Sequence, residues 1–330
     1  MTTPAHRRPH PVSHLAVLAA ATAAIVAALL APSPSRGAGA DTLPYPVWRH
    51  VVDPTALPLG DGHVSLSAPA VGSTYSCSTG RPVGPNAPTS TPWIHGTTWD
   101  PAEKPAVEGR VLWSAARHTV SVIGATRVVT TNDLPHGEPT GIFPIAPSDP
   151  AYAYDHNPNS IIAQSLTYRL PLHSRAAPRP SCLPKGPIGV LSDGVVLFDA
   201  LDASNRDAVA HEIQDLCNGH PDGSDMYHYH DVSSCLLAHA HGPATVVGFA
   251  LDGYPIVVER DAQGRLPGDA DLDACHGRVS TIVLDGRRVR TYHYDATLEY
   301  PYVMGCFHGT PVATAHHGHG PGPTGPPTRP

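Results

Sequence analysis

The sequence is poor in charged and aromatic side chains, which make up 15% and 6% of its 330 residues. Its formal net charge is −7 and it has no basic stripe, which argues against nucleic acid or an anionic membrane as a partner. Glycine and proline are abundant instead, with 30 and 38 residues, and such a composition interrupts helices and favours short strands joined by turns. We therefore expect a mainly β fold with one or two short helices.

The sequence also lacks the signatures of several enzyme classes. It has no Gly-x-Ser-x-Gly motif of a serine hydrolase, although Ser192, Ser233 and Ser234 lie near histidine or aspartate residues. His211-Glu212 is not followed by the second histidine of a His-Glu-x-x-His zinc motif. The Gly-x-Gly-x-x-Gly and P-loop signatures are absent as well, so we expect no nucleotide cofactor and assign no catalytic residue.

Long apolar runs are scarce, and the one that is present lies near the N-terminus. Residues 15–31 are uncharged and apolar, follow Arg7 and Arg8, and precede the small residues Ala38-Gly39-Ala40. This order is typical of a secretory signal peptide with its cleavage site, and an uncleaved anchor is the alternative. We predict that residues 1–40 are removed and that the mature protein is secreted or extracytoplasmic, with no membrane association after cleavage.

Composition divides the remaining chain into three parts. Residues 41–110 form a Pro-rich N-terminal extension, and residues 111–308 form a β domain in which strands are legible. Residues 309–330 form a tail rich in His, Gly and Pro that cannot build a core, so we expect it to be disordered. The tail histidines could bind metals weakly, but a solvated tail is the simpler interpretation.

Local patterns within the β domain predict individual elements. Residues 119–123 and 126–131 flank a Gly-Ala turn and predict a hairpin. Asp193-Gly194 and Asp252-Gly253 separate apolar runs and predict two more hairpins, with positive φ at both turn positions. Residues 206–216 predict a helix that places Val209, Ile213 and Leu216 on one stripe, after Ser204 or Asn205 as N-cap, and residues 269–274 predict a shorter one.

The most informative feature is a motif that occurs twice, each time between two cysteines. The copies are Tyr227-His228-Tyr229-His230, between Cys217 and Cys235, and Tyr292-His293-Tyr294-Asp295, between Cys275 and Cys306. Each copy is preceded by one of the Asp-Gly hairpins. We interpret residues 186–235 and 248–306 as an internal duplication that forms one pseudo-twofold domain.

The six cysteines predict disulfides. All of them follow the predicted signal peptide, their number is even, and no Cys-x-x-Cys metal motif occurs. If the two copies fold alike, each has a local pair, and the two cysteines outside the repeats remain for each other. The predicted pairs are Cys217–Cys235, Cys275–Cys306 and Cys77–Cys182.

The histidines of the repeated motif are candidate metal ligands. Side chains alternate along a strand, so His228 and His230 project from one face and the two tyrosines from the other. His293 and Asp295 have the same spacing in the second copy. If the symmetry brings the two strands together, these four side chains converge, and their donor atoms suit zinc, manganese or copper. Alternatively, the histidines only form hydrogen bonds inside the core.

Two further histidines lie beside cysteines of the repeats. His220 and His276 could complete the metal site or orient its ligands. Tyr227 and Tyr292 could act as polar neighbours of an open coordination position.

These motifs resemble the YHYH domain family of secreted, mainly bacterial proteins. The resemblance rests on Cys-Asn-Gly-His-Pro at residues 217–221, on residues 248–256, on the two Tyr-His-Tyr motifs and on residues 302–307, and it covers roughly residues 125–308. It implies no settled activity. Asp295 stands where the family often has histidine, so a role that needs four histidines is not implied.

The sequence leaves three functions open. The first is binding of a divalent transition metal by the paired motifs. The second is a module that binds a polysaccharide or the cell envelope through stacked aromatic rings, although none of the four tryptophans lies in a repeat. The third is a structural domain without metal. A small molecule or a polysaccharide is the expected ligand.

Overall fold

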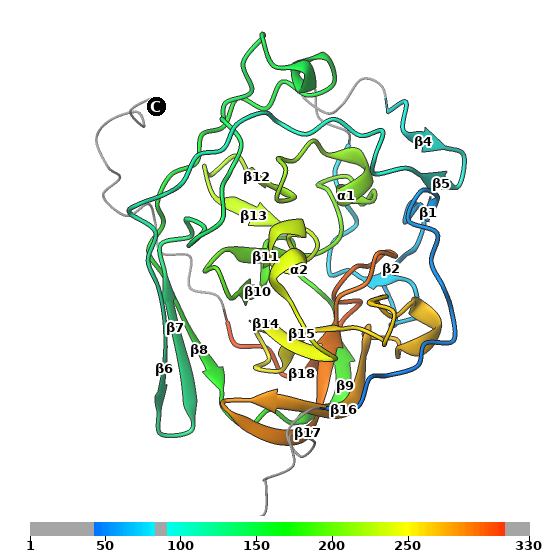
Figure 1. Cartoon of the computed structure of the whole chain (residues 1–330), viewed down its shortest axis with the longest axis vertical. Helices are drawn as coiled ribbons and strands as arrows, with labels where there is room; N and C mark the ends of the chain where they lie inside the picture. The colour runs from blue at the N-terminus through cyan, green and yellow to red at the C-terminus, as the bar shows by residue number, and fades with distance from the viewer. Residues whose placement is uncertain (1–42, 83–90, 314–330) are drawn as a thin grey trace, which may run out of the picture. The chain divides into compact units, whose positions relative to one another are not determined.

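Both copies of the repeated motif lie in a single eight-stranded sheet (Figure 1). The computed structural model describes residues 43–82 and 91–313, and the described residues belong to one compact unit that begins at Leu43. In the sheet, the strand order is β12-β13-β11-β10-β14-β15-β17-β16. The strands are β10 (Pro187–Leu191), β11 (Val196–Phe198), β12 (Gly219–Pro221), β13 (Tyr227–Tyr229), β14 (Ala244–Ala250), β15 (Pro255–Glu259), β16 (Gly277–Leu284) and β17 (Arg287–Asp295).

The two halves of this sheet have matching connections. From the central β10–β14 pair outward, each half contains a hairpin, then a parallel neighbour, then an antiparallel outer strand. Tyr229 pairs with Leu197 of β11 and Gly219 of β12, and Tyr294 pairs with Ile256 of β15 and Gly277 of β16. The halves thus share topology and register, while their origin by duplication stays a prediction.

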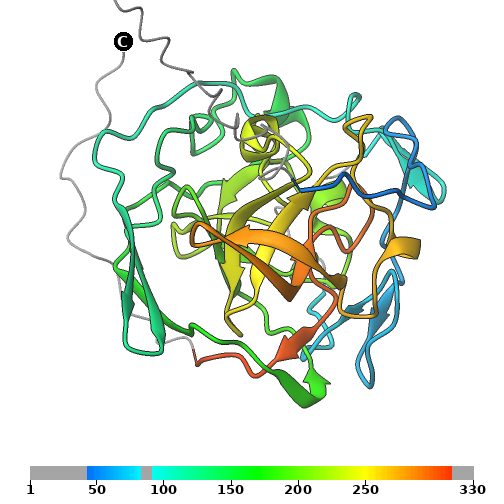
Figure 2. The same cartoon turned by 60° about the horizontal axis from the view of Figure 1, so that its bottom comes forward.

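Smaller sheets and short helices surround the central sheet. In Figure 2, the β16–β17 pair (orange) lies beside the yellow strands of the centre. The smaller sheets are β1-β5-β4, β2-β3, β6-β7-β8 and β9-β18. Their strands are β1 (Leu57–Pro58), β2 (Val64–Ser65), β3 (Thr74–Tyr75), β4 (Ile94–His95), β5 (Thr98–Trp99), β6 (His118–Ile123), β7 (Thr126–Thr131), β8 (Leu166–Pro171), β9 (Ala176–Ser181) and β18 (Phe307–Gly309). The helices are α1 (Ala208–His211), α2 (Ser234–His239) and the 3-10 turns η1 (Pro150–Ala153) and η2 (Asp269–Asp271). The mainly β fold class is therefore confirmed.

The predicted hairpins are confirmed, but the two Asp-Gly turns differ from the prediction. The hairpin of β6 and β7 pairs Ile123 with Thr126, as expected. In the Asp-Gly turns only the glycines have positive φ, 93° at Gly194 and 83° at Gly253. The aspartates keep ordinary backbone angles because each turn is closed by its glycine, from Gly194 N to Leu191 O at 3.0 Å and from Gly253 N to Ala250 O at 2.8 Å, so that only the residue after the aspartate is left-handed.

The prediction of a helix over residues 206–216 is wrong in its length. α1 begins after Asp207, whose carboxylate accepts a hydrogen bond from Ala210 N at 3.2 Å, and it ends at His211 because the backbone of Glu212 is extended. Val209 and Ile213 are buried as predicted, but Leu216 is 56% exposed. The N-cap is therefore neither Ser204 nor Asn205. Residues 269–274 similarly contain only the 3-10 turn η2.

The predicted disulfides are confirmed. Cys217 bonds to Cys235, Cys275 to Cys306, and Cys77 to Cys182. The first of these links α2 to Cys217, two residues before β12, and it therefore fixes the start of the strand that carries His220. Burial of the tyrosine face of the motif contributes to the core, where Tyr227, Tyr229 and Tyr294 are fully buried.

The ends of the chain lie outside the described residues. These include the predicted signal peptide at residues 1–40 and most of the predicted tail. Within the part that is described, no helix is long and apolar enough to cross a membrane.

Candidate metal centre

The structure divides the predicted metal ligands into two groups. β13 carries the first motif and β17 the second, and β11, β10, β14 and β15 lie between them in the sheet. The prediction that His228, His230, His293 and Asp295 converge is therefore wrong, because the symmetry places the two motifs on opposite sides of the β10–β14 pair. Each motif instead gathers its own neighbours, and two separate clusters of potential ligand atoms result.

The first cluster brings together three histidines. His220 comes from β12, His228 from β13, and His230 follows β13 directly. Each offers a ring nitrogen, and these three atoms lie within 4.8 Å of one another. The alternation of side chains along the strand, together with the pairing of His220 with His228 across β12 and β13, explains why all three rings share one face.

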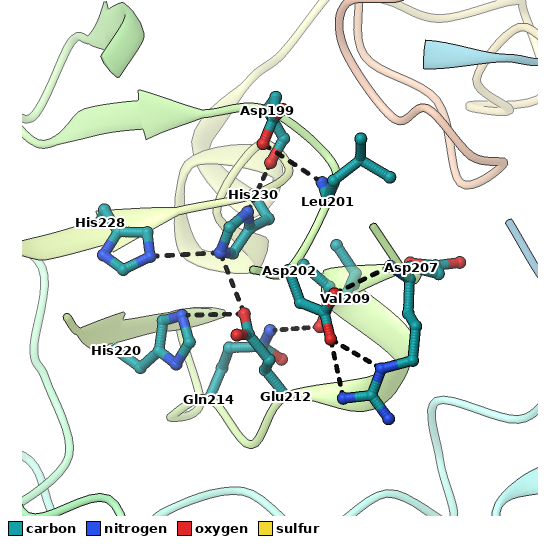
Figure 3. Close-up of polar contacts among 12 residues, drawn as sticks. Asp199, Leu201, Asp202, Asp207, Val209, Glu212, Gln214, His220, His228 and His230 are labelled. Carbon is teal, nitrogen blue, oxygen red and sulfur yellow. Dashed lines mark hydrogen bonds and ion pairs between the residues drawn. The ribbon is translucent and has the colours of Figure 1, made fainter. Parts of the chain in front are cut away.

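Glu212 completes this cluster, although the sequence did not identify it. Its Oε2 lies 3.1 Å from Nε2 of His230 and 3.4 Å from Nε2 of His220 (Figure 3). The carboxylate reaches the histidines because α1 ends one residue earlier and the chain turns toward β12. No spacing rule connects Glu212 to the motif. The apolar pattern placed Glu212 within a longer helix, and Glu212 was therefore not identified as a ligand.

Backbone carbonyls hold two of the imidazoles. Nδ1 of His228 lies 3.2 Å from the carbonyl oxygen of Met226, and Nδ1 of His230 lies close to that of Asp199. A carbonyl oxygen only accepts, so both Nδ1 atoms carry hydrogen and donate. The Nε2 atoms are therefore free to act as ligands, and they face each other at 3.1 Å. This arrangement, with one ring nitrogen fixed by the backbone, is common for histidines that bind metals.

Burial and charge affect the ionisation of the cluster. Burial lowers the pKa of His220 to about 4, and it lowers the pKa of His228 far below its ordinary value. Burial also lowers the pKa of His230, but the hydrogen bond and charge of Glu212 outweigh it, so the net shift is upward. Burial opposes ionisation of Glu212 as well, yet the surrounding histidines keep its pKa below the ordinary value. Without a bound cation, the cluster would therefore combine the carboxylate of Glu212 with neutral rings of His220 and His228.

A large cavity opens on this cluster. Its volume is about 1020 Å³, and the three histidines and Glu212 are part of its wall. Phe198 also lines it and stacks on the ring of His228, with 4.0 Å between ring centroids. Lys185 contributes a positive charge and Asp155 a carboxyl group. A ligand bound by the histidines would thus be in contact with a space that a small molecule can enter.

The second cluster comprises Glu259, His293 and Asp295. Nδ1 of His293 lies 3.2 Å from Oδ2 of Asp295, and its Nε2 lies 2.8 Å from the hydroxyl of Ser280. His276 belongs to neither cluster. It lies one residue before β16 with φ of 68°, and its Nε2 lies 3.0 Å from the hydroxyl of Thr297.

The tyrosines of the motif do not face the clusters. The hydroxyl of Tyr227 donates a hydrogen bond of 2.8 Å to Oδ2 of Asp215, and that of Tyr292 donates one of 3.0 Å to Oδ1 of Asp273. The suggestion that they neighbour an open coordination position is therefore wrong, since strand alternation directs them to the opposite face. Ser233 caps α2, and Ser234 donates to a backbone carbonyl, so both have structural roles.

Fold and site together define a β-rich, disulfide-linked domain with a buried histidine cluster beside a cavity. Residues 167–266 match the family described as YHYH protein. The resemblance seen in the motifs is thus confirmed over these residues, which include the whole first cluster and end before the second motif. No curated protein and no solved structure matches the chain.

Proposed function

We propose that the protein binds one divalent transition-metal ion through Nε2 of His220, His228 and His230 and the carboxylate of Glu212. The observation that carries this proposal is the contact between His228 and His230. Both Nδ1 atoms donate to carbonyls, so two lone pairs face each other at 3.1 Å unless a positive charge lies between them. A shared proton or a metal ion supplies that charge.

The distances favour the metal. Bonds of about 2.1 Å to a tetrahedral ion place its donor atoms roughly 3.4 Å apart. The contacts of Glu212 with His230 and His220, at 3.1 and 3.4 Å, and that of His228 with His230 are close to this value. In addition, Nε2 of His220 is buried without a hydrogen-bond partner, which a metal bond would provide. Three imidazoles with one carboxylate suit zinc, manganese or copper.

The cavity supports a reactive rather than a purely structural metal. Four protein ligands would close a tetrahedral site, so a reactive metal here needs a fifth position on the cavity side, as zinc gains when it expands to five ligands. All four proposed ligands line a space of about 1020 Å³. We infer that the metal is reached by a small polar molecule from this cavity. When bound, the ion would polarise a carbonyl or phosphoryl oxygen or activate a water molecule.

The aromatic side chains offer less support for a polysaccharide module. Trp48, Trp93 and Trp99 are buried, and Tyr45 is the one aromatic residue among the large hydrophobic side chains that are exposed in the described chain. A stacking platform for sugar rings needs several exposed rings on one surface. The predicted signal peptide and the three disulfides lead us to infer that the protein acts outside the cytoplasm.

Isothermal titration of the metal-free protein with zinc tests the proposal. Because the tail contains histidines, His316, His317 and His319 are first replaced by alanine, and no affinity histidines are used. We expect one equivalent of zinc, and we expect His228→Ala to abolish its binding. His276→Ala is a matched control, since it removes an equally buried imidazole outside the cluster and should leave the stoichiometry unchanged. Unchanged zinc binding by folded His228→Ala contradicts the proposal.

A further inference from the structure

The second cluster is a buried set of charged groups for which the proposed function has no use. Glu259, His293 and Asp295 are each at most 4% exposed. Oδ1 of Asp295 has no partner among the described residues, Oδ2 of Asp295 has only the ion-pair contact of 3.2 Å with Nδ1 of His293, and Oε2 of Glu259 has no hydrogen bond of good geometry. Buried carboxylate oxygens without donors are costly, so this cluster depends on positive charge close to it.

The register of the sheet relates the second cluster to the first, position by position. In the first half, Gly219 pairs with Tyr229, and the next pair is His220 with His228. In the second half, Gly277 pairs with Tyr294, and the next pair is Arg278 with His293. Asp295 follows Tyr294 as His230 follows Tyr229. The three positions that hold imidazoles in the first half thus hold Arg278, His293 and Asp295 in the second.

Arg278 therefore places a permanent cation where the first half has the neutral ring of His220. Its Nε lies 3.4 Å from Oε2 of Glu259. On its outer side the guanidinium lies over the ring of Trp48, with 5.0 Å to the ring centroid. The indole nitrogen of Trp48 in turn donates to the carbonyl of Arg265 at 2.8 Å, which holds the N-terminal segment over this position.

We propose that Glu259, His293 and Asp295 form a latent metal site, which Arg278 closes by supplying the cation that a metal ion would otherwise provide. A guanidinium stays protonated at every accessible pH, so it repels a metal ion from the cluster and cannot act as a ligand. The residue at the position shared by His220 and Arg278 thus decides which half of the sheet binds metal. Zinc is the fitting probe, since imidazole and carboxylate donors both bind it.

The test is the gain of a site. The background is the full chain in which the tail histidines and the first cluster are disabled by His316→Ala, His317→Ala, His319→Ala, His228→Ala and His230→Ala. In this background we expect no zinc binding, and we expect Arg278→His to add about one equivalent. Arg278→Met is the matched control, because it removes the cation without adding a ligand, and it should bind none.

Two results would overturn the proposal. One is a folded Arg278→His protein, as judged by circular dichroism and thermal unfolding, that takes up no zinc. The other result concerns His293→Ala in a chain that keeps Arg278 and an intact first cluster. We expect this variant to bind as much zinc as the unaltered protein. Loss of one equivalent would show that the second cluster already binds metal. Absence of zinc at the first cluster contradicts the proposed function but does not affect the gain measured here.

Discussion

The hydroxyl of Tyr229 donates a hydrogen bond of 2.9 Å to Oδ2 of Asp193, the aspartate of the first Asp-Gly turn. This bond connects the strand of the histidine motif to the turn between β10 and β11. The second half repeats it between Tyr294 and Asp252, at 2.5 Å. Each Asp-Gly turn therefore serves the sheet twice, once through the conformation of its glycine and once through a carboxylate that accepts from a buried tyrosine.

Tyr229→Phe tests the importance of this bond. The variant removes the donor and leaves the carboxylate of Asp193 buried, so we expect a loss of about 1–3 kcal/mol in the free energy of unfolding. Urea denaturation measures the change. Tyr45→Phe is the control, because Tyr45 is 52% exposed and its hydroxyl should matter little. Equal stability of Tyr229→Phe and the unaltered protein would show that water replaces the tyrosine.

Glu212→Gln tests the newly identified ligand. Glutamine has nearly the same shape but no charge, so we expect zinc affinity to fall at least about 10–100-fold, the loss typical of residues that only orient a ligand, while the fold is retained. Competition with a chromophoric chelator measures this affinity. Asp222→Asn removes another carboxylate from the cavity wall, and its remaining oxygen can still accept from Ser224 N, as Oδ1 of Asp222 does at 2.8 Å. This control should bind zinc normally, and an equal loss in both variants would contradict a direct role for Glu212.

Two disulfides should differ in their effects on stability and on metal binding. Cys77–Cys182 spans 105 residues and Cys217–Cys235 spans 18, so loss of the longer loop should cost more stability, about 4.7 against about 3 kcal/mol in the loop-entropy model. Zinc affinity should show the opposite order, because Cys217 fixes the start of the strand that carries His220. Paired Cys→Ala variants, compared by denaturation and zinc titration, test both. If removal of Cys77–Cys182 lowered zinc affinity more than removal of Cys217–Cys235, this account of how His220 is positioned would be contradicted.

The ion pair of Arg127 and Asp285 predicts a pH dependence of stability. Arg127 is buried, and its guanidinium donates to both oxygens of Asp285, at 3.0 and 2.6 Å. These hydrogen bonds keep the pKa of Asp285 below its ordinary value. The ion pair therefore stabilises the folded protein fully above pH of about 4, the pKa of Asp285 in the unfolded chain. This stabilisation is lost as the pH falls through the lowered pKa of Asp285 in the folded protein.

Asp285→Asn should consequently cost about 1 kcal/mol between pH 5 and pH 8 and progressively less below pH 4. Asparagine tolerates the positive φ of 50° at this position, so the turn is retained. Thermal unfolding at several pH values measures the difference between the two proteins. A difference that does not shrink in acid would assign the loss to the turn and not to the ion pair.

Local sequence rules predicted much of this molecule. Alternation along a strand placed His228 and His230 on one face, and the repeated cysteines gave the disulfide pairs. The Asp-Gly and Gly-Ala turn sequences located the hairpins, because the position of a hairpin depends on short-range backbone geometry. In these cases the interacting residues are near in sequence or related by the repeat, except for Cys77 and Cys182, which were paired because no other cysteines remained.

The metal cluster itself depended on contacts that no local rule provides. The parallel pairing of β11 with β13 brings the backbone carbonyl of Asp199 to His230, and a carbonyl leaves no side-chain signal. Glu212 reaches the cluster because a helix ends earlier than its apolar pattern suggested. The prediction that the two motifs converge was wrong because it also depended on long-range strand order. The symmetry of a sheet can separate equivalent strands as well as bring them together.

The most direct test of the metal site is elemental analysis of the protein after His316→Ala, His317→Ala and His319→Ala, purified without affinity histidines. We predict about one equivalent of zinc, copper or manganese, and its loss when His220→Ala and His228→Ala are combined. A folded protein that contains no transition metal, and takes none up when zinc, copper or manganese is supplied, would contradict the account. In that case, a shared proton and not a metal ion joins His228 to His230.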